Sequence, residues 1–246
     1  MNTSTENLKR LLAAGLHFGH KINKWNPKMK PYIFGKRGGI HIFDLVKTAE
    51  YMEKVLNFLE KSASQGKTIL LVSTKQQTRE ILPDLAVSLG MPFVTEKWFG
   101  GLLTNWSTTR ERLKQFRNLK KERERDNFAK YVKKERNKKI KQITRLELWL
   151  SGIEKLEKKP DVVFVLDAVR DNLAIREANK CKIPVVGIAD SNANPDLLDY
   201  FIPCNDDAMK SIQLILNEVH AAIERGQKRQ QEVKEKEQEN KQNKTE

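Results

Sequence analysis

The sequence is short of cysteine and has no long apolar run, and both absences limit what the chain can be. Cys181 and Cys204 are the only cysteines among 246 residues, and each stands alone close to a run of apolar residues. Two isolated cysteines cannot build a disulfide framework, so we expect buried thiols in a reducing compartment. No run of about eighteen apolar residues occurs and the N-terminus lacks a signal-peptide pattern, so neither a membrane span nor a removable targeting segment is expected. The cytoplasm, or the interior of an organelle that encodes the protein, fits these features.

Fingerprints of cofactor and metal sites are also missing. The string QGKT at 65–68 resembles part of a phosphate-binding loop, but the glycine that the motif needs is replaced by Lys61. The string also follows a predicted helix, whereas the motif follows a strand. His17 and His20 form H-x-x-H without a paired C-x-x-C, which is a weak pattern for zinc. The sequence therefore predicts no cofactor and no bound metal.

Three aspartates lie where an open α/β sheet usually binds ligands. Asp167 and Asp190 follow predicted strands, and Asp206 begins the last predicted helix. A cation held there could serve an RNA-directed hydrolase or transferase. No serine or threonine nucleophile, lysine or glycine-rich loop completes a reactive set, so helix caps and loop carboxylates are the favoured interpretation. The aspartates could instead pair with the basic N-terminal part of the chain, and we predict neither an enzyme nor a small-molecule substrate.

Positive charge is in excess and lies in two separate blocks. The chain has 46 lysines and arginines against 32 aspartates and glutamates, a net charge of +14. Residues 1–50 hold nine basic and three acidic residues, and residues 110–145 hold sixteen and five. Residues 146–224 hold eight basic and fourteen acidic residues. Positive charge in two separate blocks, followed by an acidic later half, indicates a polyanionic partner, nucleic acid before membrane.

Continuous apolar runs predict the strands of a buried parallel sheet. Three such runs lie at 68–73, 161–168 and 183–190, and shorter strands are expected at 92–94 and 199–203. Strands of this kind, alternating with helical patterns, imply parallel βαβ units with helices on both faces. The fold class is therefore α/β, a three-layer sandwich.

Helical patterns separate these strands. The spacing of apolar residues and the capping residues predict helices over 5–13, 44–64, 75–89, 172–180 and 205–225. We assign residues 1–104 and 157–226 to the α/β domain. Residues 227–246, which are rich in lysine, glutamine, glutamate and asparagine, are expected to form a disordered tail or a frayed helix.

The segment 105–156 interrupts the sandwich and predicts a basic helical hairpin. It contains no proline and no glycine before Gly152, and its apolar residues recur at spacings of three, four and seven. This narrow seam suits two antiparallel helices packed as a coiled coil, with a turn near 124–127. Each arm of about twenty residues would reach roughly 30 Å.

The segment 15–43 combines aromatic rings with basic side chains on an irregular backbone. Its glycines and prolines exclude a long helix, and residues 32–35 and 40–43 alternate well enough for a short β-hairpin with KRGG as its turn. Rings and cations held in this way are suited to stacking on bases and neutralising phosphates. The segment therefore predicts an RNA-facing surface.

A second motif, EKWFGGLLTNW at 96–106, has two adjacent glycines after Trp98 and Phe99. Glycine permits a close backbone approach or a positive φ angle. Thr104 and Asn105 are expected to cap the first hairpin helix, and exposed amides at the positive end of a helix suit phosphate.

These motifs together resemble a known family. HFGH, WNPKMKPYIFG, WFGGLLTNW, VLDA, IPVVGIADSNANPD and IPCNDDA occur in this order and closely resemble the S2 family of small-subunit ribosomal proteins, of the bacterial and organellar type. The resemblance covers about residues 5–226. It implies a flavodoxin-like parallel sheet with a protruding α-hairpin, bound to small-subunit ribosomal RNA. The turn KRGG departs from the family pattern, which is commonly less rich in glycine.

The resemblance also implies a role late in subunit assembly, in translation, and in supporting the mRNA-binding ribosomal protein S1 near the mRNA exit. Carried over by motif, the expected RNA-binding residues are His17, His20, Lys21, Trp25, Asn26, Lys28, Lys30, Lys36, Arg37, Trp98, Thr104 and Asn105. Charge alone adds Arg110, Arg112, Lys114 and Arg117 of the hairpin. The alternatives are the RNA-directed hydrolase or transferase described above and a coiled-coil module that recruits a protein.

Overall fold

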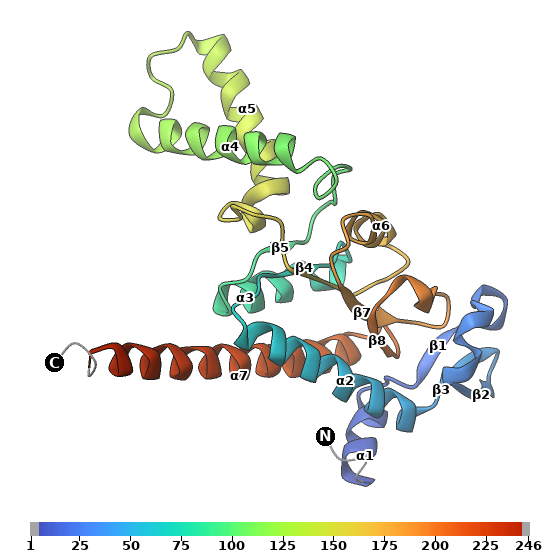
Figure 1. The fold of residues 1–246 in the computed structure, drawn as a ribbon. Helices are drawn as coiled ribbons and strands as arrows, with labels where there is room; N and C mark the ends of the chain where they lie inside the picture. Colours follow the sequence, from blue (N-terminus) through green and yellow to red (C-terminus); the bar gives the residue numbers. More distant parts are fainter. Residues whose placement is uncertain (1–4, 243–246) are drawn as a thin grey trace.

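The computed structural model describes residues 5–242, with side chains described as far as residue 236. A parallel sheet with helices on both faces forms the body of the molecule (Figure 1). A small antiparallel sheet lies at one end, a pair of helices projects from the body, and a long C-terminal helix extends away from it. Within the described residues, no helix is both long and apolar enough to cross a membrane.

The main sheet is parallel throughout and has the strand order β5-β4-β6-β7-β8. Counted from the first of these strands, the order is 2-1-3-4-5, which is the flavodoxin-like arrangement. The observed fold class therefore confirms the expected α/β sheet. The strands are β4 (Ile69–Val72), β5 (Phe93–Val94), β6 (Val162–Val165), β7 (Val185–Ala189) and β8 (Tyr200–Pro203).

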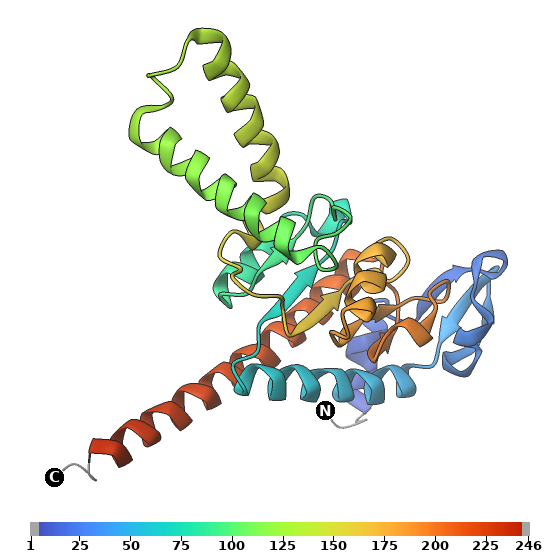
Figure 2. The ribbon, with the colours of Figure 1, turned by 45° about the horizontal axis from the view of Figure 1, so that its top comes forward.

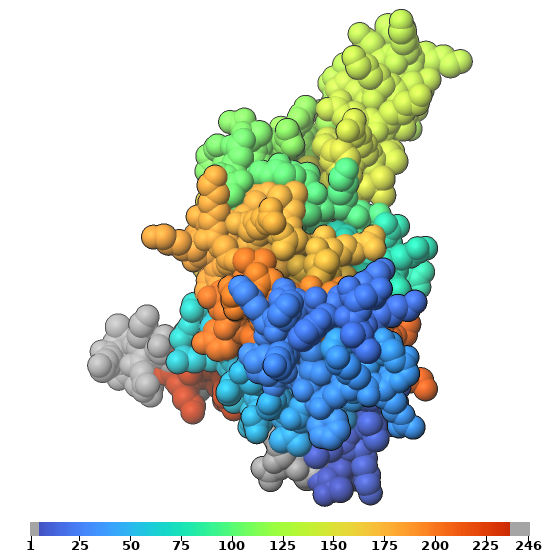
Figure 3. Space-filling model, turned by 90° about the vertical axis from the view of Figure 1, so that its right-hand side faces the viewer, coloured from blue at the N-terminus to red at the C-terminus, as the bar shows by residue number. Residues whose placement is uncertain are grey.

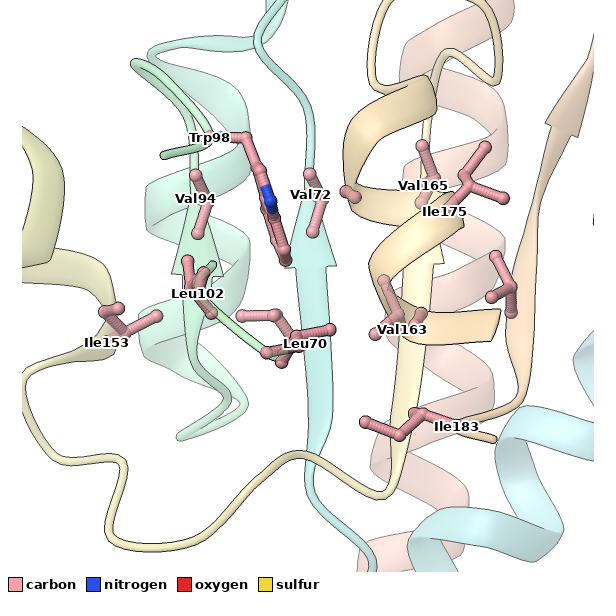
Figure 4. Close-up of a cluster of buried hydrophobic side chains, with 14 of the residues drawn as sticks. Leu70, Val72, Val94, Trp98, Leu102, Ile153, Val163, Val165, Ile175 and Ile183 are labelled. Carbon is pink, nitrogen blue, oxygen red and sulfur yellow. The ribbon is translucent and has the colours of Figure 1, made fainter. Parts of the chain in front are cut away.

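Alternation along the strands divides the core into two layers. Ile69 and Leu71 of β4 pack with α2 (Leu45–Ser64), α3 (Ile81–Ser88) and α7 (Met209–Gln242). Leu70 and Val72 point to the other face, where they pack with α6 (Asn172–Lys180) and the loop after β5 (Figure 4). All four residues of β4 are fully buried, because both faces of the sheet are covered. The predicted three layers are thereby confirmed.

The N-terminal end of α2 is capped as the sequence predicts. The amide of Val46 donates to the side chain of Asp44, and α2 runs to Ser64. The first helix, α1 (Thr5–Ala13), also has its predicted bounds. The predicted helix over 75–89 is instead divided into η3 (Gln76–Thr78) and α3, because the Thr78 hydroxyl donates to Ser73 and holds that turn.

Helix α7 lies along α2 and continues well beyond the sandwich (Figures 1 and 2). The composition after Gly226 favoured disorder or a frayed helix, whereas the structure is helical as far as Gln242. Contacts with α2 account for the first part of this difference, because Arg225 and Arg229 both pair with the largely buried Glu60 of α2. Residues 243–246 of the predicted tail lie outside the described residues.

The segment 15–43 folds into a small antiparallel sheet of β1 (Phe18–Lys21), β3 (Ile40–Phe43) and β2 (Ile33–Arg37), in that order. The β2–β3 hairpin is the predicted one, and its turn places Gly38 and Gly39 at φ angles of 58° and 79°. Positive φ at both central residues matches the right-handed twist of a hairpin, which explains the glycine-rich KRGG turn. Two short 3-10 helices, η1 (Ile22–Lys24) and η2 (Pro27–Tyr32), join β1 to β2.

Strand β1 was not expected from the sequence. It has only four residues, and its partner β3 lies about twenty positions further along the chain, so no local pattern marks the pairing.

The predicted helical hairpin consists of α4 (Trp106–Asp126) and α5 (Lys133–Leu150). The turn lies at 127–132, slightly later than expected, since Asn127 ends α4 in the left-handed region at φ 47°. Leu113, Phe116 and Ile143 are buried between the arms, and Phe128 fills the space near the turn. The arms diverge toward the turn in both ribbon views, so the structure does not show the predicted coiled coil (Figures 1 and 2).

Candidate nucleic-acid interface

The predicted RNA-facing segment is attached to the carboxyl end of the main sheet. The backbone amide of His20 donates to the Ser191 hydroxyl at 2.8 Å, and the amide of Asn26 donates to the Ser191 carbonyl at 2.7 Å. A Cβ atom on Gly19 would lie 2.9 Å from the Ser191 hydroxyl, so this approach requires glycine. The segment, in blue, covers one side of the molecule next to the orange residues around 190–205 (Figure 3).

Beneath this attachment lies a buried cluster of charges. The ammonium nitrogen of Lys75 is 2.7 Å from Asp206, 2.8 Å from Asp207 and 3.1 Å from Asp167. The Nδ1 atom of His20 is 3.0 Å from the Asp190 carboxylate, and its Nε2 atom is 3.5 Å from Asp207. We call Lys75, His20 and these four aspartates the Lys75 cluster.

Four carboxylates face one ammonium and one imidazole, and this imbalance sets the protonation of the Lys75 cluster. Burial, with the charges of Asp190 and Asp167 added, raises the pKa of Asp206 to about 8. Burial opposes the charged form of Lys75, but the charges and hydrogen bonds of its carboxylate neighbours outweigh burial and raise its pKa. The hydrogen bond to Asp190 raises the pKa of His20 against the effect of burial. The cluster therefore favours charged His20 and Lys75 with a neutral Asp206.

Lys75 changes the interpretation of the acidic strand ends. Among the described residues, no group of histidine, cysteine, aspartate or glutamate side chains is arranged to hold a metal ion. The Lys75 ammonium lies between Asp167 and Asp206, where the hydrolase alternative would place a cation. The suggestion that the strand-end aspartates pair with the basic N-terminal part is correct for His20 with Asp190. His20 thus holds the segment in place and is less available to RNA than the sequence suggested, whereas Lys28 pairs with Asp196 at the exposed surface.

Several other predicted residues of the segment are also partly engaged within the protein. The Trp25 ring packs on the His41 ring, with 4.9 Å between the ring centroids. Trp25 is half-buried and His41 is buried. Burial lowers the pKa of His17 and of His41, so both rings favour the neutral form. The Asn26 side chain accepts a hydrogen bond from the Lys28 amide and caps η2.

The remaining basic residues of the segment face solvent. Lys21, Lys30, Lys36 and Arg37 are exposed, as predicted for phosphate contacts. Phe34 lies beside them on β2 with 81 % of its surface exposed. Sequence reasoning missed Phe34, although its place one residue before Gly35 in an alternating strand is a signal that its ring points outward.

Trp98 does not belong to the interface, which corrects the prediction that it contacts RNA. Its ring is 6 % exposed and packs among Val94, Val72 and Leu102 in the core (Figure 4). The indole N–H donates to the Glu177 carboxylate at 3.1 Å. A buried ring with its polar atom bonded internally cannot stack on a base.

Glu177 also occupies the amides that were expected to bind phosphate. The backbone N–H groups of Gly101, Leu103 and Thr104 donate to its carboxylate at 2.8–3.2 Å, and the Thr104 hydroxyl donates at 3.1 Å. Burial would raise the pKa of Glu177, but these bonds outweigh burial and lower it. The amides do bind an anion, as the motif predicts, but the anion is supplied by α6 of the same chain. Neither Lys75 nor Glu177 could be identified as a partner from sequence, because both contacts join distant elements.

At the start of α4, Asn105 departs from its predicted role. It precedes the helix, but its side chain accepts from the Thr108 hydroxyl at 3.0 Å and makes no capping bond to a backbone amide. Arg110, Arg112 and Lys114 are exposed, whereas the half-buried Arg117 donates to the Leu113 carbonyl. Further along, Arg123 pairs with Glu147 and Lys130 with Glu122. The first part of α4 therefore presents exposed cations that have no acidic partner in the described part of the chain.

The fold and this arrangement define a class: an α/β protein whose buried acidic groups are neutralised internally and whose exposed cations lie on two separate elements. A family model described as Ribosomal protein S2 matches residues 11–226. The chain is 43% identical over 224 residues to the small ribosomal subunit protein uS2 of Coprothermobacter proteolyticus, covering 91% of this chain and 84% of that protein. It is 41% identical over 224 residues to the uS2 of Chloroflexus aggregans, covering 91% and 94%.

The chain belongs to the ribosomal protein S2 family. The family consists of structural, non-enzymatic proteins of the small ribosomal subunit, which confirms the expectation that the chain is not an enzyme. It is a ribosomal protein that takes part in translation.

Proposed function

We propose that the chain binds small-subunit ribosomal RNA through two cationic surfaces, one on the segment 15–43 and one on the first part of α4. The supporting observation is the division of charge. The acidic groups at the carboxyl ends of the strands are paired with Lys75 and His20, while Lys36, Arg37 and Arg110 remain exposed. Exposed cations on a rigid platform contact phosphates and release counterions.

The RNA-facing set of this proposal differs from the sequence prediction in a few positions. Trp98 and Thr104 are left out because Glu177 engages them, and Lys28 and Arg117 because they have partners within the chain. Phe34 and Lys24 are added because both are exposed on the same segment. The cationic members are Lys21, Lys24, Lys30, Lys36, Arg37, Arg110, Arg112 and Lys114.

Salt dependence of binding to small-subunit ribosomal RNA tests this proposal. With roughly seven to ten phosphate contacts, the logarithm of the association constant should fall against the logarithm of salt concentration with a slope of about −6 to −9. The double variant Lys36→Gln/Arg37→Gln should reduce the magnitude of the slope by about 2. The matched variant Lys67→Gln removes an exposed charge just before β4, at the opposite end of the strands, and should leave the slope unchanged. A flat slope for the unmodified chain would refute RNA as the partner and favour a protein-recruiting module.

The family relationship supports two finer parts of the proposal. The chain contributes late in subunit assembly, and it supports the docking of ribosomal protein S1 near the mRNA exit. Reconstituting small subunits with and without the chain tests both, because late-assembling particles and bound S1 can be separated and quantified after sedimentation. Subunits that assemble and retain S1 equally well without the chain would contradict these two roles while leaving RNA binding intact.

A further inference from the structure

A cavity of about 390 Å³ lies between the arms of the helical hairpin, close to the body. Its lining includes Phe99, Arg112, Gln115, Gln142, Arg145 and Trp149. The two arms approach each other near the body and diverge further out (Figure 2), and the lining residues come from both arms and from Phe99 before α4. We call it the arginine–aromatic pocket.

Two guanidinium–ring pairs shape this pocket. The guanidinium of Arg145 lies over the Trp149 ring, 4.6 Å from its centroid, and that of Arg112 lies over the Phe99 ring at 6.0 Å. Contacts of this kind hold a planar cation in a fixed orientation, so its outer face is ready to receive another flat group. Both rings are half-buried, while both arginines are exposed.

The charge and polarity of the pocket match one kind of ligand. No acidic residue is among those that line it, and within the described part of the chain neither arginine takes part in an ion pair. The amides of Gln115 and Gln142 likewise lack a hydrogen-bond partner among the described residues, and an amide can both donate to and accept from the edge of a base. Cations for phosphate, a flat face for stacking and amides for a base edge are the groups that bind an unpaired nucleotide.

We propose that the arginine–aromatic pocket binds a single unpaired nucleotide of RNA, whose base stacks on the Arg145–Trp149 pair and whose phosphate meets Arg112. Its volume lies in the range of small-molecule sites, about 300–1,000 Å³, which is enough for one nucleotide and too small for a duplex. This inference rests on the proposed RNA binding and specifies one contact in it. An acidic peptide would satisfy the arginines but would leave the flat faces and the two amides unused.

The test compares two RNA pentamers that have the same phosphates, one with bases and one abasic, by fluorescence anisotropy with the full chain. The unmodified chain should bind the pentamer with bases about tenfold more tightly, since one stacked base contributes about 1–3 kcal/mol. Arg145→Lys keeps the charge but removes the planar face, so it should reduce this preference to within about twofold and leave the abasic affinity unchanged. Arg176→Lys makes the same change on the exposed surface of α6, outside the pocket, and should keep the preference.

Three other outcomes would contradict the inference, and each of them identifies a different cause. If Arg145→Lys keeps the full preference, the base stacks elsewhere, and RNA binding survives without this pocket. If a glutamate-rich peptide displaces the pentamer with bases and loses its own affinity in Arg145→Lys, the pocket recognises acidic protein instead. If the unmodified chain binds neither pentamer nor ribosomal RNA, the proposed function fails with the inference. Both substitutions are at exposed positions, and thermal melting of each variant confirms that the fold is kept.

Discussion

At the scale of single residues, buried charges in this protein are neutralised by partners that come from distant parts of the chain. Glu177 of α6 satisfies three backbone amides, a hydroxyl and an indole of the loop 98–104. Lys75 neutralises the carboxylates at the strand ends. A buried polar group without a partner destabilises a fold strongly, so both residues hold the platform together.

Replacing Glu177 by glutamine should therefore destabilise the fold. The substitution removes the negative charge and turns an NH₂ group toward buried donors, which should lower the free energy of unfolding by about 3 kcal/mol. Urea unfolding measures the change. Glu50→Gln, at an exposed position of α2, is the control and should shift it by less than about 0.5 kcal/mol. Equal effects of the two substitutions would contradict the role assigned to Glu177.

The Lys75 cluster should make stability depend on pH. The folded-state pKa of Asp206 is raised to about 8 from an ordinary value of 3.8, and that of His20 is raised as well. A raised folded pKa stabilises the fold fully below the ordinary value, and this stabilisation is lost as pH rises through the folded value. The free energy of unfolding should thus fall between about pH 4 and pH 8 and level off above that range.

Asp206→Asn should flatten this fall, because the variant has no carboxyl to deprotonate and Lys75 retains Asp167 and Asp207 as partners. Urea titrations at several pH values measure the slope. Asp84→Asn, which changes an exposed aspartate of α3, should leave the slope as it is in the unmodified chain. A slope that Asp206→Asn does not alter would show that Asp206 is not the group that titrates.

At the scale of secondary-structure elements, the closest packing is between α2 and α7. Gly226 is buried in the middle of α7, and a Cβ atom there would lie 2.3 Å from the Glu60 carbonyl oxygen and 2.7 Å from Ala63 Cβ. The missing side chain lets the two helices approach each other. Arg225 and Arg229 then reach Glu60 from either side of the contact.

Gly226→Ala should consequently destabilise the protein, although alanine is the better helix former by about 1 kcal/mol. The clash with the α2 backbone should outweigh that gain and lower the free energy of unfolding by a net amount of about 1–3 kcal/mol. Gln231→Ala, at an exposed site on the same helix, isolates the propensity effect and should be neutral or slightly stabilising. A variant Gly226→Ala that melts above the unmodified chain would show that α2 and α7 can separate without cost.

At the scale of the whole molecule, the sheet domain and the helical hairpin are built around different contacts. The inner residues of the arms, Leu113, Phe116 and Ile143, are buried between α4 and α5. Trp106, Leu150 and Ile153, at the base of the hairpin, continue the buried cluster of the arms into the α6 face of the sheet. The hairpin therefore carries charge away from the platform without forming much of the platform's own core.

Deletion of residues 108–148, with the ends joined, should leave the sheet domain folded. The expected result is a single cooperative urea transition, together with weaker RNA binding because the exposed cations of α4 are lost. Far-ultraviolet circular dichroism follows the first property, and anisotropy with ribosomal RNA follows the second. A broad, non-cooperative transition would show that the hairpin is part of the folding unit.

Much of this architecture could be predicted because its signals are local. The bounds of α1, α2 and α6, the five parallel strands and the β2–β3 hairpin follow from capping residues, apolar runs and the KRGG turn. The motifs also sufficed to identify the family, since several of them are long. The site was less predictable: exposure of Lys36 and Arg37 was expected correctly, whereas Trp98 is a core residue and Thr104 is bound by Glu177.

The sequence by itself determined the elements, the excess of positive charge and its two locations, because periodicity, capping and composition act over short stretches of chain. Only the tertiary structure decided which charges remain free. A carboxylate on α6 reaches the amides after β5, a lysine after β4 enters the acidic strand ends, and the hairpin arms enclose a pocket between them. Partners of this kind are chosen by distances in space, and each buried charge must find its partner inside the fold before the remaining cations can face RNA.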